Sequence, residues 1–390
     1  MTNLHRKTSP PETNKFLVPA GLMIVAVTYG FARYGYGLFL PEIQQDLALS
    51  VEIMGMIAGA SSAGAIVATI AGANLSEKFG SRLPVLLGGS TAFLGMLVMA
   101  ISHTPIVLAV GAILAGTSPG LAYAPLADAI AALIAPPKQN RAFAIINSGT
   151  SLGVIISGPA ALLAGANWRF AWLGFAFAAL LATAWNASIL PGWAKQNKKQ
   201  TAGWNMKLRL PSLHSASLLF GLSTGVYWTF AVDLLVDQGG LPGDWSRLFW
   251  IIIGVCGISG GFAGHLITRI GLRPALRFAQ LMISAAILLP GIFPTLLTTS
   301  LLSAITFGAA FILVSGLLGI WSIKIYHDCP SAGISVLFFL VAIGQLLGPV
   351  MAGYVSGMLS MPFAFLAAGV LSLAGMLFAP AADADCSPNA

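Results

Sequence analysis

Charged side chains are scarce in this chain of 390 residues, of which they make up only 8%. A soluble domain carries about 25% charged residues, so this chain has too little charge to cover a water-facing surface. Hydrophobic residues make up 57% of it, and the mean hydropathy is +0.86. These values exclude a soluble enzyme and a disordered protein. They also exclude a nucleic-acid-binding protein, because the 19 Lys and Arg residues behind the net charge of +7 are dispersed.

Cysteine, clustered histidine and phosphate-binding motifs are missing as well. Cys256, Cys329 and Cys386 show no Cys-x-x-Cys spacing, which argues against a disulfide framework and against a metal site. The five histidines are not clustered, and the chain has neither an HExxH motif nor a GxxxxGK[ST] loop. We therefore expect no metal, no cofactor and no direct use of ATP.

Long apolar runs make up most of the sequence. A helix needs about 20 apolar residues to cross a bilayer, and breaks at Pro, Gly and charged residues divide the chain into twelve such runs. The predicted spans are Leu17–Leu40, Ile53–Leu75, Leu83–Ser102, Ile106–Ile134, Ala142–Ala164, Trp168–Leu190, Leu213–Val236, Trp245–Ile267, Pro274–Leu289, Leu296–Ile323, Ala332–Gly357 and Pro362–Ala381. The first run is too long for the apolar region of a signal peptide, so we expect it to be retained.

The predicted organisation is an all-α polytopic membrane protein of twelve helices in two halves. A polar N-terminal tail, 1–16, precedes a six-helix half, 17–190. A basic linker, 191–211, leads to the second six-helix half, 212–381, and a tail, 382–390, follows. Basic residues favour cytoplasmic loops. With both termini in the cytoplasm, sixteen of the 19 Lys and Arg lie on that side, and only Arg169 and Arg247 lie outside. We expect a multi-pass protein of the inner membrane with both termini cytoplasmic.

The two halves repeat each other in sequence. The segment Leu75-Ser-Glu-Lys-Phe-Gly-Ser-Arg82 after the second span matches Leu266-Ile-Thr-Arg-Ile-Gly-Leu-Arg273 after the eighth. Gly158-Pro159 in the fifth span likewise matches Gly348-Pro349 in the eleventh. Transporters built from two parallel six-helix repeats bind substrate near the membrane midplane between the halves.

These loops, together with Asn167-Trp168-Arg169 before the sixth span, resemble the major facilitator superfamily, in its twelve-span bacterial permease type. The resemblance covers about residues 17–381 and implies alternating access with a central substrate site. It also implies that the two loops contribute to gating, through the following residues: Glu77, Lys78, Gly80, Arg82, Arg269, Gly271 and Arg273. The alternative is a tight turn with a topology signal and no gating role.

The chain departs from the pattern of proton-driven drug exporters in this family. The fourth span, Gly111–Ala132, contains no Arg, and Gly158-Pro159 is not followed by the paired glycines of the exporter motif. These departures weaken the case for a drug exporter.

Arg33 lies inside the first span, where a charge costs about 2.5–3.5 kcal/mol on insertion scales. Tyr29, Arg33 and Tyr36 follow helical spacing, so one face presents all three. We expect Arg33 to bind an anionic group of the substrate. The alternatives are a structural ion pair or carbonyl contact, or an arginine that reaches the outer interface.

Two acids also lie within spans and are candidates for proton coupling. Asp233 is a protonation site or a partner for Arg33 in one interpretation, and a solvated acid of the outer mouth in the other. Asp128 is predicted to pair with Lys78 or Arg82, with a proton relay as the alternative.

Aromatic and amide side chains supply the remaining substrate-binding candidates. Such groups around an apolar pocket suit a small organic ligand, with helix packing as the alternative. They are Tyr123, Asn147, Tyr227, Trp228, Trp321 and Gln345.

The function predicted from these features is secondary active transport of a small organic solute, driven by an ion or solute gradient. We expect an organic anion or zwitterion because of Arg33. Efflux of amphipathic compounds is the alternative, and a membrane enzyme or receptor is the alternative of another class. The expected partners are the solute, the lipid bilayer and a coupling proton or ion, with no nucleic acid and a monomeric state.

Overall fold

The computed structural model describes residues 16–165, 167–191, 211–259, 263–326 and 330–380, and all regular secondary structure in them is helical. In the N-terminal half the helices are α1 (Leu17–Val25), the π-helix η1 (Ala26–Phe31), α2 (Gly35–Leu38), α3 (Leu40–Leu47), α4 (Val51–Phe79), α5 (Arg82–Ala100), α6 (Pro105–Leu133), α7 (Pro136–Asn147), α8 (Gly149–Ala164) and α9 (Trp168–Ile189). In the C-terminal half they are α10 (Pro211–Asp233), the π-helix η2 (Leu234–Gln238), α11 (Gly243–Gly257), α12 (Ala263–Ile270), α13 (Leu272–Ile292), α14 (Leu297–Ile325), α15 (Pro330–Met358), α16 (Met361–Ala374) and the 3₁₀-helix η4 (Gly375–Phe378).

The twelve-span architecture is confirmed. Within the described residues, ten helices are long and apolar enough to cross a membrane. The first span is an apolar helix, Leu17–Arg33, that continues through α2 and α3, and the eighth consists of α11 and α12. These two complete the count: the α-helical part of the first span is shorter than 18 residues, and residues 260–262 of the eighth lie outside the described part of the chain, so neither is among the ten.

The prediction of one continuous helix over 17–40 was wrong. The first span changes to a π-helix at Ala26, turns at Ala32–Tyr34 and runs on to Leu47. The change falls in the glycine-rich segment around Gly30, Gly35 and Gly37, where intrinsic helix propensity is low. Single π-helical turns of this kind are frequent at functional sites.

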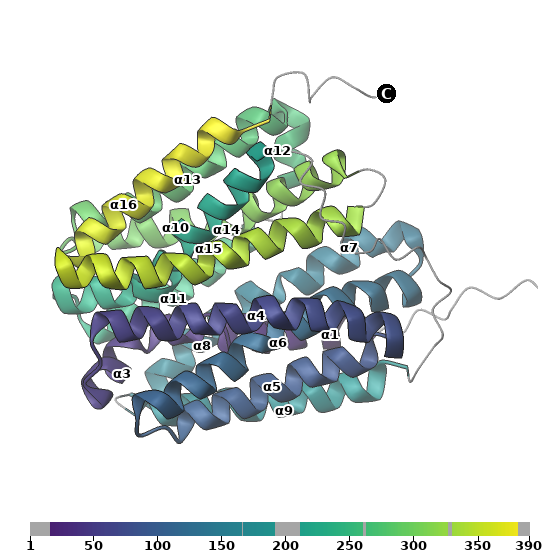
Figure 1. Ribbon diagram of the computed structural model, residues 1–390, viewed down its shortest axis with the longest axis horizontal. Helices are drawn as coiled ribbons and strands as arrows, with labels where there is room; N and C mark the ends of the chain where they lie inside the picture. Colours follow the sequence, from purple (N-terminus) through teal and green to yellow (C-terminus); the bar gives the residue numbers. More distant parts are fainter. Residues whose placement is uncertain (1–15, 166, 192–210, 260–262, 327–329, 381–390) are drawn as a thin grey trace, which may run out of the picture.

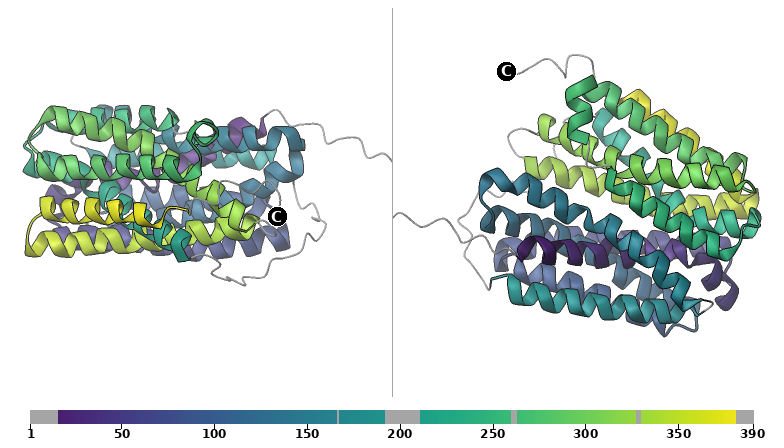
Figure 2. Two further views of the ribbon diagram at one scale, coloured as in Figure 1. Left: turned by 90° about the horizontal axis from the view of Figure 1, so that it is seen from above. Right: turned by 180° about the vertical axis from the view of Figure 1, so that it is seen from behind.

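The two halves lie one above the other in Figure 1, the N-terminal half below and the C-terminal half above. The right view of Figure 2, from behind, shows the same separation. The halves contact each other mainly where α4 packs against α15 and α8 against α11, with further contacts of α2 and α3 with α10 and of α2 with α11. The ribbons converge where α3 and the start of α11 lie, which we call the junction end (Figure 1). The opposite end, where α9 ends and α10 begins, is called the linker end.

Large apolar side chains cover the outside of the bundle. Leu163 is 91% exposed, Val67 68% and Phe177 61%. A protein with so apolar a surface would aggregate in water, whereas the lipid tails of a bilayer solvate that surface. The hydroxyls inside the bundle are satisfied within it, as Thr28 illustrates by donating to the carbonyl of Ile24 one turn earlier.

The repeat seen in the sequence is also present in the backbone. Gly80 has φ 80° and ψ 170°, and Gly271 has φ 85° and ψ 164°. Only glycine occupies this region readily. The same turn therefore connects α4 to α5 in one half and α12 to α13 in the other.

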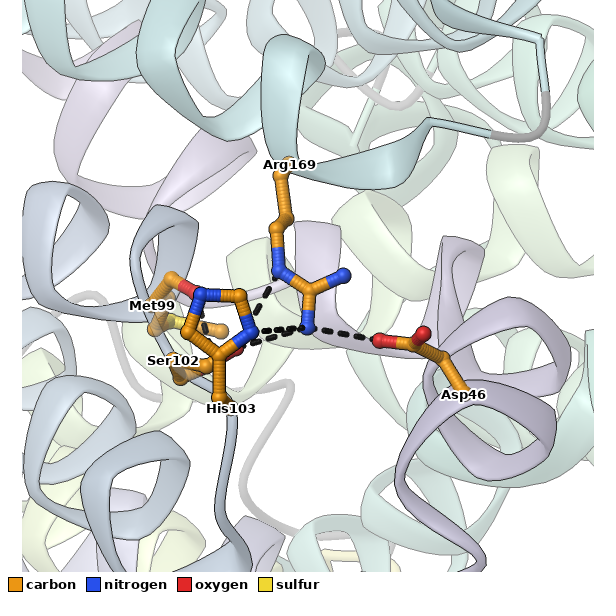
Figure 3. A network of polar contacts seen from close by, with 5 residues as sticks. All are labelled: Asp46, Met99, Ser102, His103 and Arg169. Atoms are coloured by element: carbon orange, nitrogen blue, oxygen red, sulfur yellow. Dashed lines mark hydrogen bonds and ion pairs between the residues drawn. The ribbon is translucent and has the colours of Figure 1, made fainter.

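A polar network at the junction end fastens together three helices of the N-terminal half (Figure 3). Arg169, at the start of α9, forms an ion pair with Asp46 of α3 at 2.6 Å. Its Nε and Nη2 donate to the carbonyl of Ser102 at 3.1 and 2.7 Å, and its guanidinium lies 4.4 Å from the Trp168 ring centroid. The ends of α3, α5 and α9 are thus held as one unit.

A candidate substrate cavity between the two halves

A small cavity lies at the middle of the contact between the halves. Its volume is about 40 Å³, far below the roughly 300–1,000 Å³ of a pocket that encloses a small organic ligand. Side chains of the α2 region and α4 line it from the N-terminal half, and α10 and α15 line it from the other half. The polar lining consists of Arg33, Ser61, Ser62, Thr229 and Gln345, and the aromatic lining of Tyr34, Tyr36 and Trp228.

Arg33 is the positive charge of this cavity. Its Nη2 donates to Gln345 Oε1 at 2.6 Å and to Ser62 Oγ at 3.5 Å. In the part of the chain that the structure describes, no carboxylate lies within 4 Å of the guanidinium. The partners of Arg33 are therefore neutral oxygens, and the structural ion pair with Asp233 is not formed.

Two aromatic rings from opposite halves close over the cavity. Tyr34 and Trp228 stack with centroids 4.3 Å apart and planes inclined by 21°. The Trp228 indole N–H has no hydrogen-bond partner among the described residues, so it offers a buried donor beside the cavity. Tyr36 donates to the carbonyl of Met54 at 3.4 Å.

Three predicted residues form a second polar group, one layer toward the linker end. Tyr123 donates from its hydroxyl to Asn147 Oδ1 at 2.8 Å, and its ring is in edge contact with Tyr29 at 5.5 Å. Tyr29 in turn lies 6.3 Å from Tyr34. This group is joined to the cavity through aromatic contacts and does not line it.

Two of the predicted residues lie apart from the cavity. Tyr227 is fully buried within the C-terminal half, where its ring stacks on Phe307 at 3.7 Å and its hydroxyl lies 2.7 Å from Ser303 Oγ. Trp321 is 1% exposed in the linker-side part of α14. Neither lines the cavity, and their surroundings are those of helix packing.

The two candidate proton-coupling acids have different surroundings. Asp233 is only 5% exposed, so the prediction of a solvated mouth acid was wrong. The amide of Gln44, from the other half, lies 3.0 Å from Asp233 Oδ1 and from Asp237 Oδ2, and it donates to both carboxyl groups when its nitrogen is assigned to the side that faces them. Asp128 accepts a hydrogen bond from Ser76 Oγ at 2.7 Å, inside the N-terminal half.

The predicted gating residues lie at the linker end. Glu77, Lys78 and Arg269 are exposed there. Arg82 donates to the carbonyl of Ala187 at 2.8 Å and so fastens α5 to α9; the pair predicted between Arg82 and Asp128 is replaced by this bond. Arg273 has a buried Nε with no partner among the described residues. Gating by these loops stays a prediction.

At the junction end, one ion pair among the described residues crosses between the halves. Arg247 of α11 lies 3.7 Å from Glu42 of α3, 2.6 Å from Asp244 and 3.0 Å from the carbonyl of Gly165, to which it donates. The side chains of Arg247 and Glu42 are only 12% and 23% exposed, so both charges lose much of their hydration. The desolvation cost of this pair therefore offsets a large part of its attraction.

Sequence reasoning missed several residues that the structure brings together. Tyr34 and Ser62 line the cavity, and Gln44 and Glu42 connect the halves. Tyr34 is adjacent to Arg33 in the sequence, and a hypothesis that allowed for an irregular helix would have included it. Ser62 lies in a run of small residues and has no distinguishing sequence signal.

The comparison with known families decides the class of the protein. Residues 22–328 match the profile of the family described as "Major Facilitator Superfamily". The chain belongs to the Major Facilitator Superfamily. It is a multi-pass membrane transporter rather than an enzyme, which confirms the class predicted from the charge pattern and the repeat.

Relatives within the superfamily carry different names. The chain is 27% identical over 285 residues to a chloramphenicol resistance protein of Streptomyces lividans, covering 70% of each chain. It is 23% identical over 395 residues to a hexuronate transporter of Bacillus subtilis (strain 168), covering 90% of each. A crystal structure of a D-xylose–proton symporter has a TM-score of 0.75 at 14% identity, covering 93% of this chain and 96% of that one. The last likeness shows the fold alone.

Proposed function

We propose that this transporter carries a small organic anion or zwitterion with a carboxylate, which binds at Arg33 in the cavity between the halves. Substrate would pass as the two halves rock about this point, driven by an ion or solute gradient. The observation that carries the proposal is the guanidinium of Arg33, which is partly buried, faces the cavity and has only neutral partners among the described residues.

The electrostatics favour an anionic ligand. A buried cation without a counter-ion is costly, and a substrate carboxylate supplies the missing charge. The planar fork of the guanidinium suits two carboxylate oxygens. The free indole N–H of Trp228 provides a further donor, and the apolar remainder of the cavity suits an organic body. The named hexuronate transporter among the relatives is in keeping with a carboxylate substrate.

Efflux of an uncharged aromatic compound is the second candidate. The stack of Tyr34 on Trp228 and the edge contacts of Trp228 with Phe307 and Phe311 form an aromatic wall. A chloramphenicol resistance protein is also among the relatives. In this alternative Arg33 holds the two halves together and does not bind the substrate.

A binding experiment separates the two. Thermal unfolding of the purified protein is followed with glucuronate, benzoate and lactate, each beside its uncharged amide, and with chloramphenicol. A ligand that binds only the folded protein raises its stability by RT ln(1 + [L]/Kd). We expect one of the carboxylates, and not its amide, to stabilise the wild type. Arg33→Ala should lose about 1.5–3 kcal/mol of binding free energy, about 10- to 150-fold in Kd.

The expected response to Arg33→Lys is intermediate, because Lys keeps the charge and loses the planar fork. Arg169→Ala is the matched control, since Arg169 is a paired arginine of the N-terminal half that does not line the cavity, and its partners Asp46 and Ser102 lie in its own half. It should bind like the wild type. Equal stabilisation of the wild type and Arg33→Ala by chloramphenicol, with no carboxylate effect, would instead favour efflux.

For energy coupling we propose a proton, with Asp233 as its site. Asp233 is buried where the halves meet and is bridged to the other half by Gln44, whereas Asp128 is held inside one half by Ser76. In proteoliposomes, Asp233→Asn should abolish accumulation driven by a pH gradient and preserve exchange of substrate without a gradient. The same loss in Asp128→Asn, with Asp233→Asn unaffected, would reverse the assignment.

For orientation we propose that the linker end faces the cytoplasm, because the basic residues gather there. The contacts between the halves at the junction end then make this an inward-facing arrangement. A cysteine in place of the exposed Gln45 should react with an impermeant thiol reagent added outside intact cells, and one in place of exposed Glu77 should not.

A further inference from the structure

The bond between Arg33 and Gln345 joins the two halves at the point where substrate is proposed to bind. Arg33 follows η1 in the N-terminal half, and Gln345 lies in the middle of α15 in the other half. Their separation of 2.6 Å is that of a strong, charge-assisted hydrogen bond. Gln345 is an amide, so it satisfies a donor of the guanidinium without neutralising its charge.

The backbone around Gln345 fixes the position of its amide. The carbonyl of Gln345 accepts a hydrogen bond from Ser62 Oγ at 3.2 Å. A Cβ at Gly225 of α10 would lie 3.0 Å from the Gln345 Cα, which shows how closely the two helices pack. Gln345 is 7% exposed and Ser62 6%. The packed backbone therefore fixes where the Gln345 side chain begins, and only its amide end is free to move.

The amide oxygen occupies the place that a carboxylate oxygen of a ligand would take. The remaining cavity of about 40 Å³ is too small for an organic acid, since small-molecule pockets measure roughly 300–1,000 Å³. A carboxylate that binds the Nη2 edge of Arg33 must first displace the oxygen of Gln345. Displacement also removes a hydrogen bond between the halves.

We propose that Gln345 is a built-in substitute for the substrate carboxylate. It holds Arg33 when the site is empty, competes with the incoming anion, and transmits its displacement to the packing of α15 against α4. This inference rests on the proposed function, because it takes Arg33 as the anion site. It adds a residue that sets the affinity and couples binding to movement of the halves.

Two substitutions of Gln345 should change the affinity for the carboxylate in opposite directions. Gln345→Met keeps the length and volume of the side chain and removes the acceptor, so the affinity for the carboxylate should rise about tenfold, which is about 1.4 kcal/mol. Gln345→Glu places a permanent carboxylate beside Arg33, so the affinity should fall at least tenfold. The ligand-free melting temperature should be higher in Gln345→Glu than in Gln345→Met.

The control variant is Gln280→Met. Gln280 is the other buried glutamine of the C-terminal half, 4% exposed, and donates to the carbonyl and hydroxyl of Ser372 within that half. Its substitution should lower the melting temperature and leave the affinity unchanged. The probes are glucuronate, benzoate and lactate with their amides, applied to each variant and to Arg33→Ala.

The outcomes distinguish the two proposals. Opposite changes of affinity in the two Gln345 variants support the inference. An unchanged or lowered affinity in Gln345→Met, with binding lost in Arg33→Ala, overturns the inference and preserves the anion site. Equal binding by the wild type and Arg33→Ala overturns the proposed function. A ligand-free Gln345→Glu that melts below Gln345→Met also overturns the inference, because its carboxylate would then lack the expected pairing with Arg33.

Discussion

Removing Arg247 should open the junction end. Among the described residues, Arg247 is the one cation that forms an ion pair across the two halves, with Glu42 at 3.7 Å, and it also donates to the carbonyl of Gly165 at 3.0 Å. Two charges about 4 Å apart attract by about 4 kcal/mol at an effective dielectric constant of 20. Both side chains are largely buried, so the desolvation of the two charges offsets much of this attraction.

The net contribution of Arg247 to closure is therefore about 1–3 kcal/mol, the carbonyl bond included. Arg247→Ala should raise the ratio of open to closed junction ends by about 5- to 150-fold. Spin labels on cysteines at the exposed positions 45 in α3 and 238 in η2 report this change as a longer distance between the halves. The three native cysteines are replaced by serine for this measurement.

Arg169→Ala is the matched control for this prediction. Arg169 lies at the same end and also binds a carboxylate and a carbonyl, but its partners Asp46 and Ser102 belong to its own half. Its loss should lower the melting temperature and leave the distance distribution unchanged. A distribution that is the same in Arg247→Ala and in the wild type would refute the reasoning, as would an equal shift in Arg169→Ala.

Three further substitutions test the packing. Gly37→Val should also open the junction end in the spin-label experiment, because its Cβ would collide with the backbone carbonyl of Trp228; a closed distribution would contradict this. Asn186→Ala should lower thermal stability by about 1 kcal/mol by removing the hydrogen bond that its amide donates from α9 to the Ala20 carbonyl of α1, and an unchanged melting curve would count against it. Tyr227→Phe should cost about 1 kcal/mol through the lost bond to Ser303 and leave the carboxylate affinity unchanged; a weakened affinity would place Tyr227 in the site.

Much of the fold could be predicted because the bilayer imposes strong rules on sequence. Span lengths follow from its thickness, and the repeat is visible at Gly80 and Gly271, where one backbone conformation requires glycine in both halves. The irregular first span could not be predicted in this way. A uniform helical period placed Tyr29 beside Arg33, whereas the π-helix and the turn bring Tyr34 to the cavity.

The candidate site was predictable only in part, for a related reason. Arg33 is conspicuous because an intramembrane charge is costly, and Gln345 because polar residues are rare in its span. Their contact depends on how the two halves face each other, and no local pattern encodes this. Glu42 and Arg247 lie 205 positions apart in the sequence, and neither has a periodic or compositional signal that indicates the other.

The most direct test of the account is transport itself. Proteoliposomes that contain the purified protein are loaded with glucuronate, benzoate or lactate, and exchange for the labelled external acid is measured beside exchange of the matching amide. The account predicts exchange of at least one acid, none of its amide, and loss of exchange in Arg33→Ala with Arg169→Ala unaffected. Exchange at equal rates in Arg33→Ala and the wild type, or exchange of chloramphenicol alone, would contradict it.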